Sequence, residues 1–158
     1  MRNSKPLYIF DLDGTLAIID HRRHWVEKVR PSANDWRSFH QDCVFDKPNQ
    51  NVIRTMEALR ANGAEIWIFS GRSNEVRNET EQWLIENTRF EREELHTALT
   101  MRDQGDFTED DNLKAKWLSG MLEVDRNRLV AVFDDRDRVV QMWREAGISC
   151  FQVAQGKF

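Results

Sequence analysis

Long apolar runs and cysteine are both scarce in this sequence of 158 residues. No uninterrupted apolar stretch approaches the roughly 18 residues of a membrane-spanning helix, so we expect no membrane contact. Cys43 and Cys150 are too few and too far apart in the chain for a disulfide framework or a cysteine metal site. The N-terminal residues contain no apolar signal region. Together these absences predict a cytoplasmic, intracellular protein with reduced thiols.

Glycine is also sparse, and the seven glycines form no nucleotide-binding loop. The only Gly-Lys pair, Gly156-Lys157, is followed by Phe158. The phosphate-binding pattern G-x-x-x-x-G-K, followed by Ser or Thr, is therefore absent. We expect no ATP site of this kind in the chain.

Apolar strands alternate with amphipathic helices along the chain. The expected strands lie at residues 7–10, 65–69, 98–101, 128–133 and 148–153, and the expected helices at 49–62, 74–87, 110–122 and 139–146. Such alternation is typical of a Rossmann-like α/β fold, in which helices flank a central parallel sheet with right-handed crossovers. The length suits one domain, so we expect residues 1–158 to form a single unit.

The segment at about residues 20–46 interrupts this alternation. It lacks strand patterning and contains Pro31, which predicts a small helical cap inserted after the first strand. Cations outnumber anions between Asp20 and Gln41 although the whole chain has a net charge of −4, and aromatic residues are interleaved. This composition fits a groove for single-stranded nucleic acid. It fits equally well an amphipathic insert whose aromatic side chains face the core.

The stretch from Leu7 to Leu16 is an apolar strand that ends in two carboxylates, a glycine and a threonine. Asp11 falls at the carboxyl end of the strand, where open α/β sheets bind ligands. With Asp13 two residues later, one carboxylate can attack a substrate while the other carries a proton. A polar turn is the plain alternative. We exclude a calcium-binding EF-hand loop, because its template requires other residues where Thr15, Leu16 and Arg22 stand.

Polar residues follow each of the first four expected strands, and a parallel sheet brings these strand ends to one edge. The residues concerned are Asp11, Asp13 and Thr15, then Ser70 and Arg72, then Arg102, and finally Asp134 and Asp135. Four strand ends with the same chemistry favour an active site over a set of unrelated turns.

This pattern resembles the haloacid dehalogenase-like (HAD) phosphohydrolases. Their four motifs are matched by the stretch 11–15, by Ser70, by a lysine and by Asp134-Asp135. More narrowly, the stretches 11–17, 70–72, 102–106, 110–114 and 134–136 are similar to the 3′-phosphatase domain of phage polynucleotide kinase/phosphatase. The resemblance covers essentially the whole chain and implies an α/β HAD fold and phosphatase activity.

The resemblance also implies catalytic roles for four residues. Asp11 would attack phosphorus and form an aspartyl-phosphate. Asp13 would protonate the leaving oxygen and then deprotonate the attacking water. Ser70 would hydrogen-bond the phosphoryl oxygens, and Lys114 would balance their charge.

The implied cofactor is Mg²⁺. Its ligands would be Asp11, the main-chain carbonyl of Asp13 and the pair Asp134 and Asp135, with water completing the coordination. Either member of the pair could bind the metal directly.

The implied phosphate- and substrate-binding residues are Thr15, Arg22, Gly71, Arg72, Arg102 and Asp110. Arg23 could replace Arg22, because the insert departs from the phage domain in length and composition. Asp110 would orient the helix that carries Lys114, or Lys114 itself.

The predicted function is removal of 3′-phosphates from nucleic-acid ends or nucleotides, by a phosphoric monoester hydrolase that lacks the kinase half. A HAD phosphatase for small molecules is the first alternative. A receiver-like phosphoacceptor module is the second, although Arg102 stands where such a module needs its acceptor aspartate. The sequence leaves open the choice between RNA and DNA and the identity of any protein partner.

Overall fold

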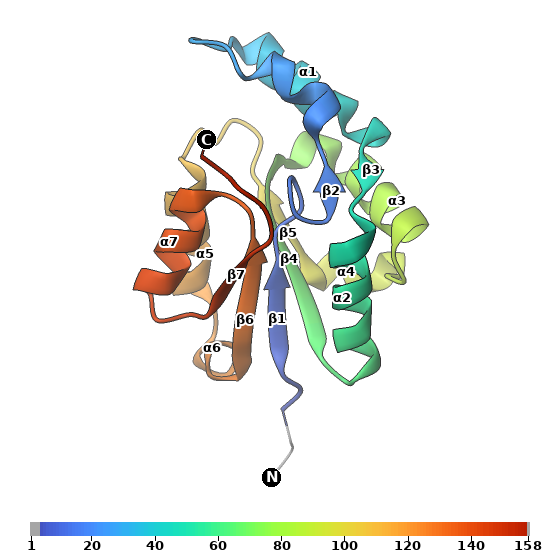
Figure 1. Cartoon of the computed structure of the whole chain (residues 1–158), viewed down its shortest axis with the longest axis vertical. Helices are drawn as coiled ribbons and strands as arrows, with labels where there is room; N and C mark the ends of the chain where they lie inside the picture. Colours follow the sequence, from blue (N-terminus) through green and yellow to red (C-terminus); the bar gives the residue numbers. More distant parts are fainter. Residues whose placement is uncertain (1–3, 158) are drawn as a thin grey trace.

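A five-stranded parallel sheet forms the centre of the computed structural model, which describes residues 4–157 (Figure 1). Its order is β5-β4-β1-β6-β7. The strands are β1 (Leu7–Phe10), β4 (Glu65–Ser73), β5 (Leu99–Arg102), β6 (Leu129–Asp134) and β7 (Cys150–Gln152). All neighbouring strands pair in parallel, so their carboxyl ends lie at one edge. The predicted α/β class is confirmed.

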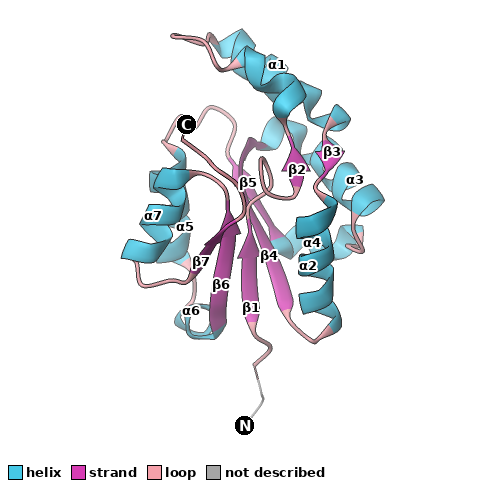
Figure 2. Cartoon of the chain, in the orientation of Figure 1, coloured by secondary structure: helices cyan, strands magenta, loops and turns pink. Residues whose placement is uncertain are grey.

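Helices cover both faces of the sheet (Figure 2). The helices on one side are α2 (Gln50–Ala61), α3 (Arg77–Asn87) and α4 (Arg92–Ala98), and those on the other are α5 (Asp110–Gly120), α6 (Glu123–Arg128) and α7 (Asp137–Glu145). Within β1, Phe10 packs in the cluster that includes Met56 of α2, whereas Ile9 packs with Trp143 of α7. Both faces of β1 are buried, which explains its continuous apolar run.

A helical insert follows β1 and lies above the carboxyl edge of the sheet (Figure 1). The short antiparallel strands β2 (Ala17–Ile18) and β3 (Lys47–Pro48) pair at its base. Between them are η1 (Asp20–Trp25), α1 (Ala33–Gln41) and η2 (Asp42–Phe45). We call residues 20–46 the insert.

The main helix of the insert, α1, begins with a capping box. The Ser32 hydroxyl accepts a hydrogen bond from the Asp35 N–H at 3.1 Å, and the Asp35 carboxylate accepts one from the Ser32 N–H at 2.7 Å. Both bonds satisfy N–H groups that a helix start leaves unpaired. The buried side chains of α1 are Phe39 and His40, in its last turn. This turn therefore anchors the insert to the core.

Several elements differ from the sequence expectation. The short strands β2 and β3 and the helices α4 and α6 were not expected. Both helices are short, and α6 buries no side chain, so neither has the apolar periodicity that reveals a helix. β4 continues to Ser73. Ser70 and Arg72 therefore belong to the strand and not to a loop after it.

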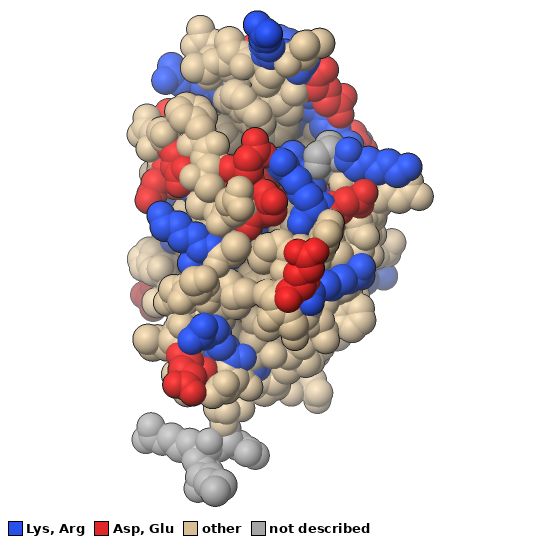
Figure 3. All heavy atoms as spheres, turned by 90° about the vertical axis from the view of Figure 1, so that its left-hand side faces the viewer, with Lys and Arg blue, Asp and Glu red and all other residues tan. Residues whose placement is uncertain are grey.

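The face that carries α5 and α7 has acidic and basic side chains interspersed (Figure 3). This mixture agrees with the small net charge of −4 and gives the face no strong field of one sign. Among residues 4–157, no helix is both long and apolar enough to cross a membrane.

Candidate active site

The loop after β1 is a tight turn built on the carbonyl of Leu12. This oxygen accepts hydrogen bonds from the N–H groups of Thr15, Leu16 and Ala17 at 3.2, 3.0 and 2.9 Å. Gly14 adopts a φ of 84°, which favours glycine, and a Cβ there would collide with the Asp135 carboxylate. The glycine thus lets the turn after β1 approach the end of β6.

Three buried carboxylates and one lysine gather at this approach, and we call Asp11, Asp134, Asp135 and Lys114 the acidic cluster. One oxygen from each carboxylate lies within 4.8 Å of the others. The Lys114 ammonium donates to Oδ1 of Asp11 and to Oδ2 of Asp134, each at 2.7 Å. The Thr15 hydroxyl donates to the second oxygen of Asp11 at 3.1 Å. Asp11 is therefore held from both sides.

Burial and like charge dominate the electrostatics of the acidic cluster. Burial raises the pKa of Asp11 well above its usual range, and the charges of Asp134 and Asp135 add to this while Lys114 opposes it. Burial and the Asp134 charge raise the pKa of Asp135 to about 7. Burial lowers the pKa of Lys114, but Asp11 and Asp134 raise it by more, so the lysine stays charged.

Three carboxylates against one ammonium leave the acidic cluster with an excess of negative charge when all are ionised. A buried excess of this kind is unfavourable without a counter-charge. Three converging carboxylate oxygens are the donor set that a hard divalent cation prefers. The residues Asp11, Asp134 and Asp135 therefore fit a metal centre, and the Asp13 side chain is not part of this set.

Asp13 takes part in a second group, the arginine cluster, which consists of Asp13, Arg22, Arg72 and Asp46. Nη2 of Arg22 donates to Oδ1 of Asp13 at 2.7 Å, and Nη2 of Arg72 donates to the same oxygen. Both arginines also donate to Asp46. Burial raises the pKa of Asp13, but Arg22 and Arg72 lower it by more, to well below its ordinary value. The structure thus holds Asp13 as a carboxylate.

Asp46 was not among the residues predicted from the sequence. It lies at the end of the insert, just before Lys47, and is buried. Its partners Arg22 and Arg72 are 24 and 26 positions away in the sequence. No local pattern distinguishes such an aspartate from an ordinary loop residue.

A third set of contacts joins the ends of β4, β5 and β6 to the start of α5. Arg102 donates through Nε to the Gly71 carbonyl at 2.8 Å and through Nη1 to the Thr108 carbonyl at 2.6 Å. The Asp110 carboxylate accepts from both Arg102 and Arg136. A Cβ at Gly71 would press against Asp110. These contacts fix the first turn of α5, one turn before Lys114.

The predicted phosphate-binding residues therefore have different surroundings in the structure. Ser70 is buried, and its hydroxyl accepts a hydrogen bond from the Arg72 N–H at 3.2 Å. Thr15 contacts Asp11, Arg22 and Arg72 contact Asp13, and Arg102 directs its guanidinium to protein acceptors. Arg136 was missed, although it directly follows the predicted pair Asp134 and Asp135. The roles of the predicted phosphate-binding residues toward substrate stay predictions.

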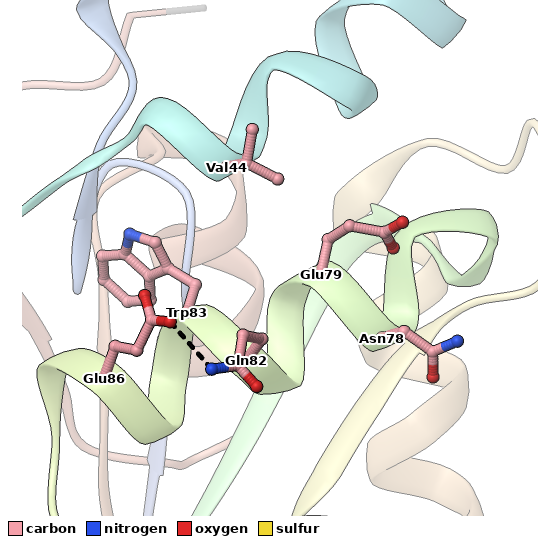
Figure 4. Close-up of a pocket in the computed structure, with 6 residues that line it drawn as sticks. All are labelled: Val44, Asn78, Glu79, Gln82, Trp83 and Glu86. Carbon is pink, nitrogen blue, oxygen red and sulfur yellow. Dashed lines mark hydrogen bonds between the residues drawn. The ribbon is translucent and has the colours of Figure 1, made fainter.

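A cavity of about 390 Å³ lies elsewhere, between η2 and α3 (Figure 4). Its lining residues are Val44, Asn78, Glu79, Gln82, Trp83 and Glu86. None of the predicted site residues lines it. Two glutamates make it unsuitable for a phosphate, so the strand-end site remains the candidate.

A parallel sheet whose carboxyl edge gathers these aspartates, a lysine and a serine defines a HAD-type phosphatase domain. This class replaces the receiver-like alternative. The family model of the polynucleotide kinase PNKP phosphatase domain matches residues 5–158, and the chain belongs to this family.

Solved structures and a viral protein show the same relationship. A chain in the Pnkp1/Rnl/Hen1 complex is 27% identical, with a TM-score of 0.72, and the match covers 99% of this chain and 48% of that one. A second structure, of the Pnkp1/Rnl/Hen1 RNA repair complex, gives 28% identity, a TM-score of 0.73 and coverage of 99% and 45%.

A protein of the Autographa californica nuclear polyhedrosis virus, named for bifunctional polynucleotide kinase and RNA ligase activity, is 29% identical over 139 residues. These residues are 87% of this chain and 18% of the viral protein. The class C acid phosphatase of Bacillus anthracis, at 13% identity and a TM-score of 0.64 over 99% of this chain and 69% of that one, shares the fold. The chain thus spans less than half the length of the viral protein and of the two chains from the Pnkp1/Rnl/Hen1 structures.

Proposed function

We propose that this chain is a Mg²⁺-dependent phosphomonoesterase that removes 3′-phosphates from polynucleotide ends or nucleotides through an aspartyl-phosphate. The observation that carries the proposal is the placement of Asp11, which lies at a strand end between Lys114 and Thr15 and beside Asp134 and Asp135. The names of the relatives, which refer to polynucleotide kinase and RNA repair, support nucleic-acid ends as the substrate class.

In the first step, a carboxylate oxygen of Asp11 forms a bond to phosphorus while the bond from phosphorus to the 3′-oxygen breaks. The hydrogen bonds from Lys114 and Thr15 fix the orientation of the carboxylate before substrate arrives. Because Asp11 must be ionised to attack, the raised pKa of this group has to be offset by positive charge. Lys114 opposes the rise but does not cancel it.

Mg²⁺, held by Asp11, Asp134, Asp135 and the main-chain carbonyl of Asp13, would supply the further positive charge that lets an anionic nucleophile approach an anionic phosphate. The excess negative charge of the acidic cluster fits this role. Ser70, with the Gly71 and Arg72 backbone, would donate hydrogen bonds to the phosphoryl oxygens.

Asp13 serves as the acid and base of the reaction in this proposal. It gives a proton to the leaving 3′-oxygen, and as a carboxylate it then takes a proton from the water that hydrolyses the aspartyl-phosphate. The arginine cluster favours the carboxylate form, which suits the second step directly. The first step needs the protonated form, with the proton on Oδ2, because Oδ1 accepts from Arg22 and Arg72.

The test is phosphate release from a 3′-phosphorylated oligonucleotide, the same oligonucleotide with a 5′-phosphate, and a nucleoside 3′-monophosphate. Each is measured with Mg²⁺ and with EDTA. We expect Mg²⁺-dependent release from the 3′-phosphates alone. Equal release from sugar phosphates would favour the small-molecule alternative, and no release from any substrate would refute the proposal.

A further inference from the structure

Asp46 is the most heavily bonded carboxylate of the insert. Its Oδ1 accepts from Nε of Arg22 at 2.7 Å and lies 2.8 Å from Nε2 of His21. Its Oδ2 accepts from Nη2 of Arg22 at 2.7 Å and from Nη2 of Arg72 at 2.9 Å. The Asp46 carbonyl accepts from the Trp83 indole at 2.8 Å. Side chain and main chain are therefore both fixed.

The two arginines reach Asp46 from different parts of the fold. Arg22 lies in η1 of the insert, whereas Arg72 lies near the end of β4 in the core. Asp46 thus joins the insert to the sheet at the point where the insert returns to β3. Arg22 and Arg72 also donate to one oxygen of Asp13, Oδ1, so these bonds leave Oδ2 of that carboxylate unused.

Exposure separates the two carboxylates that share the arginine pair. The side chains of Asp46, Arg22 and Arg72 are all 0% exposed, whereas the Asp13 side chain is 19% exposed. Asp13 is therefore the carboxylate that solvent and substrate can reach. Asp46 is the fully buried partner of both arginines.

Two buried guanidiniums need two carboxylates for their charge to be balanced, because an unpaired buried charge is strongly destabilising. While Asp13 carries the proton that it gives to the leaving group, it is neutral, and Asp46 is the remaining carboxylate of the pair. Without Asp46, both arginines would depend on Asp13 alone. They would then shift, and Asp13 would shift with them.

We propose that Asp46 is a positioning residue for Asp13: it holds Arg22 and Arg72 so that these arginines fix one oxygen of Asp13 and leave the other directed at the leaving group. This inference rests on the proposed function, in which Asp13 is the acid and base. It assigns to the insert a part in the chemistry as well as in substrate contact.

The test compares two substrates that differ in their need for an acid. A 3′-phosphorylated dinucleotide releases a poorly leaving sugar alkoxide, whereas p-nitrophenyl phosphate releases a stable phenolate that needs no proton. The quantity compared is the single-turnover rate of leaving-group release, because the later hydrolysis of the aspartyl-phosphate is common to both substrates and also needs Asp13. Since general acid catalysis contributes about 10²- to 10⁴-fold, we expect Asp46→Asn to lower this rate about 100-fold on the dinucleotide and less than about threefold on the aryl phosphate. Equal losses on both substrates would overturn the inference.

Two further variants keep the result interpretable. Asp42→Asn removes a carboxylate from η2, the short helix that ends just before Asp46, and Asp42 bonds Trp25 and not the arginines. It should leave the ratio of the two rates unchanged. Asp46→Glu keeps the charge but moves it by one methylene, and it should lower the dinucleotide rate selectively even if Asp46→Asn does not fold. Wild-type rates for Asp46→Glu on both substrates would contradict the inference.

Asp13→Asn separates this inference from the function on which it rests. If Asp13→Asn loses the dinucleotide reaction selectively and Asp46→Asn does not, Asp46 is no positioning residue. If Asp13→Asn itself lowers both rates equally, Asp13 is not the acid, and the proposed function fails first.

Discussion

The acidic cluster and the arginine cluster lie side by side but differ in charge balance. The acidic cluster has three carboxylates for one ammonium, whereas the arginine cluster has two carboxylates for two guanidiniums. An incomplete set of buried charges needs a further cation, and a complete set holds its members in place. The first arrangement therefore suits binding and attack, and the second suits the orientation of a single group.

The largest effect is expected at the only cation of the acidic cluster. Lys114→Met should lower phosphate release by at least about 100-fold, because a preorganised charge at the reacting phosphate is lost. It should also reduce the free energy of unfolding by about 3–5 kcal/mol, since buried carboxylates lose their partner. Lys116→Met, an exposed position on the same helix, is the matched control for kinetics and urea unfolding. Similar effects of Lys114→Met and Lys116→Met would contradict the role of Lys114 in the acidic cluster.

The next largest effect is expected from Mg²⁺, which should bind at the acidic cluster and not at the arginine cluster. A ligand that binds only the folded state at about 100 times its Kd adds about 2.7 kcal/mol to the free energy of unfolding. We therefore expect saturating Mg²⁺ to raise Tm, and EDTA to reverse the rise. Asp135→Asn should abolish the effect, whereas Asp46→Asn, in the arginine cluster, should retain it. A Tm shift that persists in Asp135→Asn would place the metal elsewhere.

A smaller effect concerns His40, which lies beside the arginine cluster. Burial lowers the pKa of His40 to about 4, with Arg72, Arg22 and Arg102 adding to the shift and Asp13 opposing it. An unfolded histidine has a pKa of about 6.5. Between these values the unfolded chain binds a proton that the folded chain does not, so His40 makes the protein less stable as pH falls through this window.

Urea unfolding at pH 7 and pH 4.5 measures this contribution. The free energy of unfolding of the wild type should fall by about 2 kcal/mol more than that of His40→Gln over this range. His96→Gln, at an exposed position of α4, should behave like the wild type. An identical pH dependence of wild type and His40→Gln would contradict the buried, neutral state of this histidine.

The sequence predicted the acidic cluster better than the arginine cluster, and the reason is physical. Asp11 and Asp135 directly follow strands and Asp134 is the last residue of one, and parallel pairing alone brings strand ends together. Lys114 follows no such rule, and its place was implied by family resemblance. The local turn at Gly14 is likewise visible in the sequence.

Asp46 could not be found in this way, because its contacts depend on how a helical insert folds back over the sheet. The loop before Lys47-Pro48 carries no periodic signal, and the partners of Asp46 come from η1 and β4. α6 was missed for a related reason, since it buries no side chain. Contacts that an insert makes with a distant strand need the folded structure.

The most direct measurement is the single-turnover rate of leaving-group release by Asp11→Asn and Asp13→Asn, on both the 3′-phosphorylated dinucleotide and p-nitrophenyl phosphate. If Asp11 of the acidic cluster attacks phosphorus and the arginine cluster only orients Asp13, Asp11→Asn should abolish both reactions. Asp13→Asn should lose the dinucleotide reaction by at least about 100-fold more than the aryl one. Parallel losses in the two variants would contradict the division of labour between the clusters.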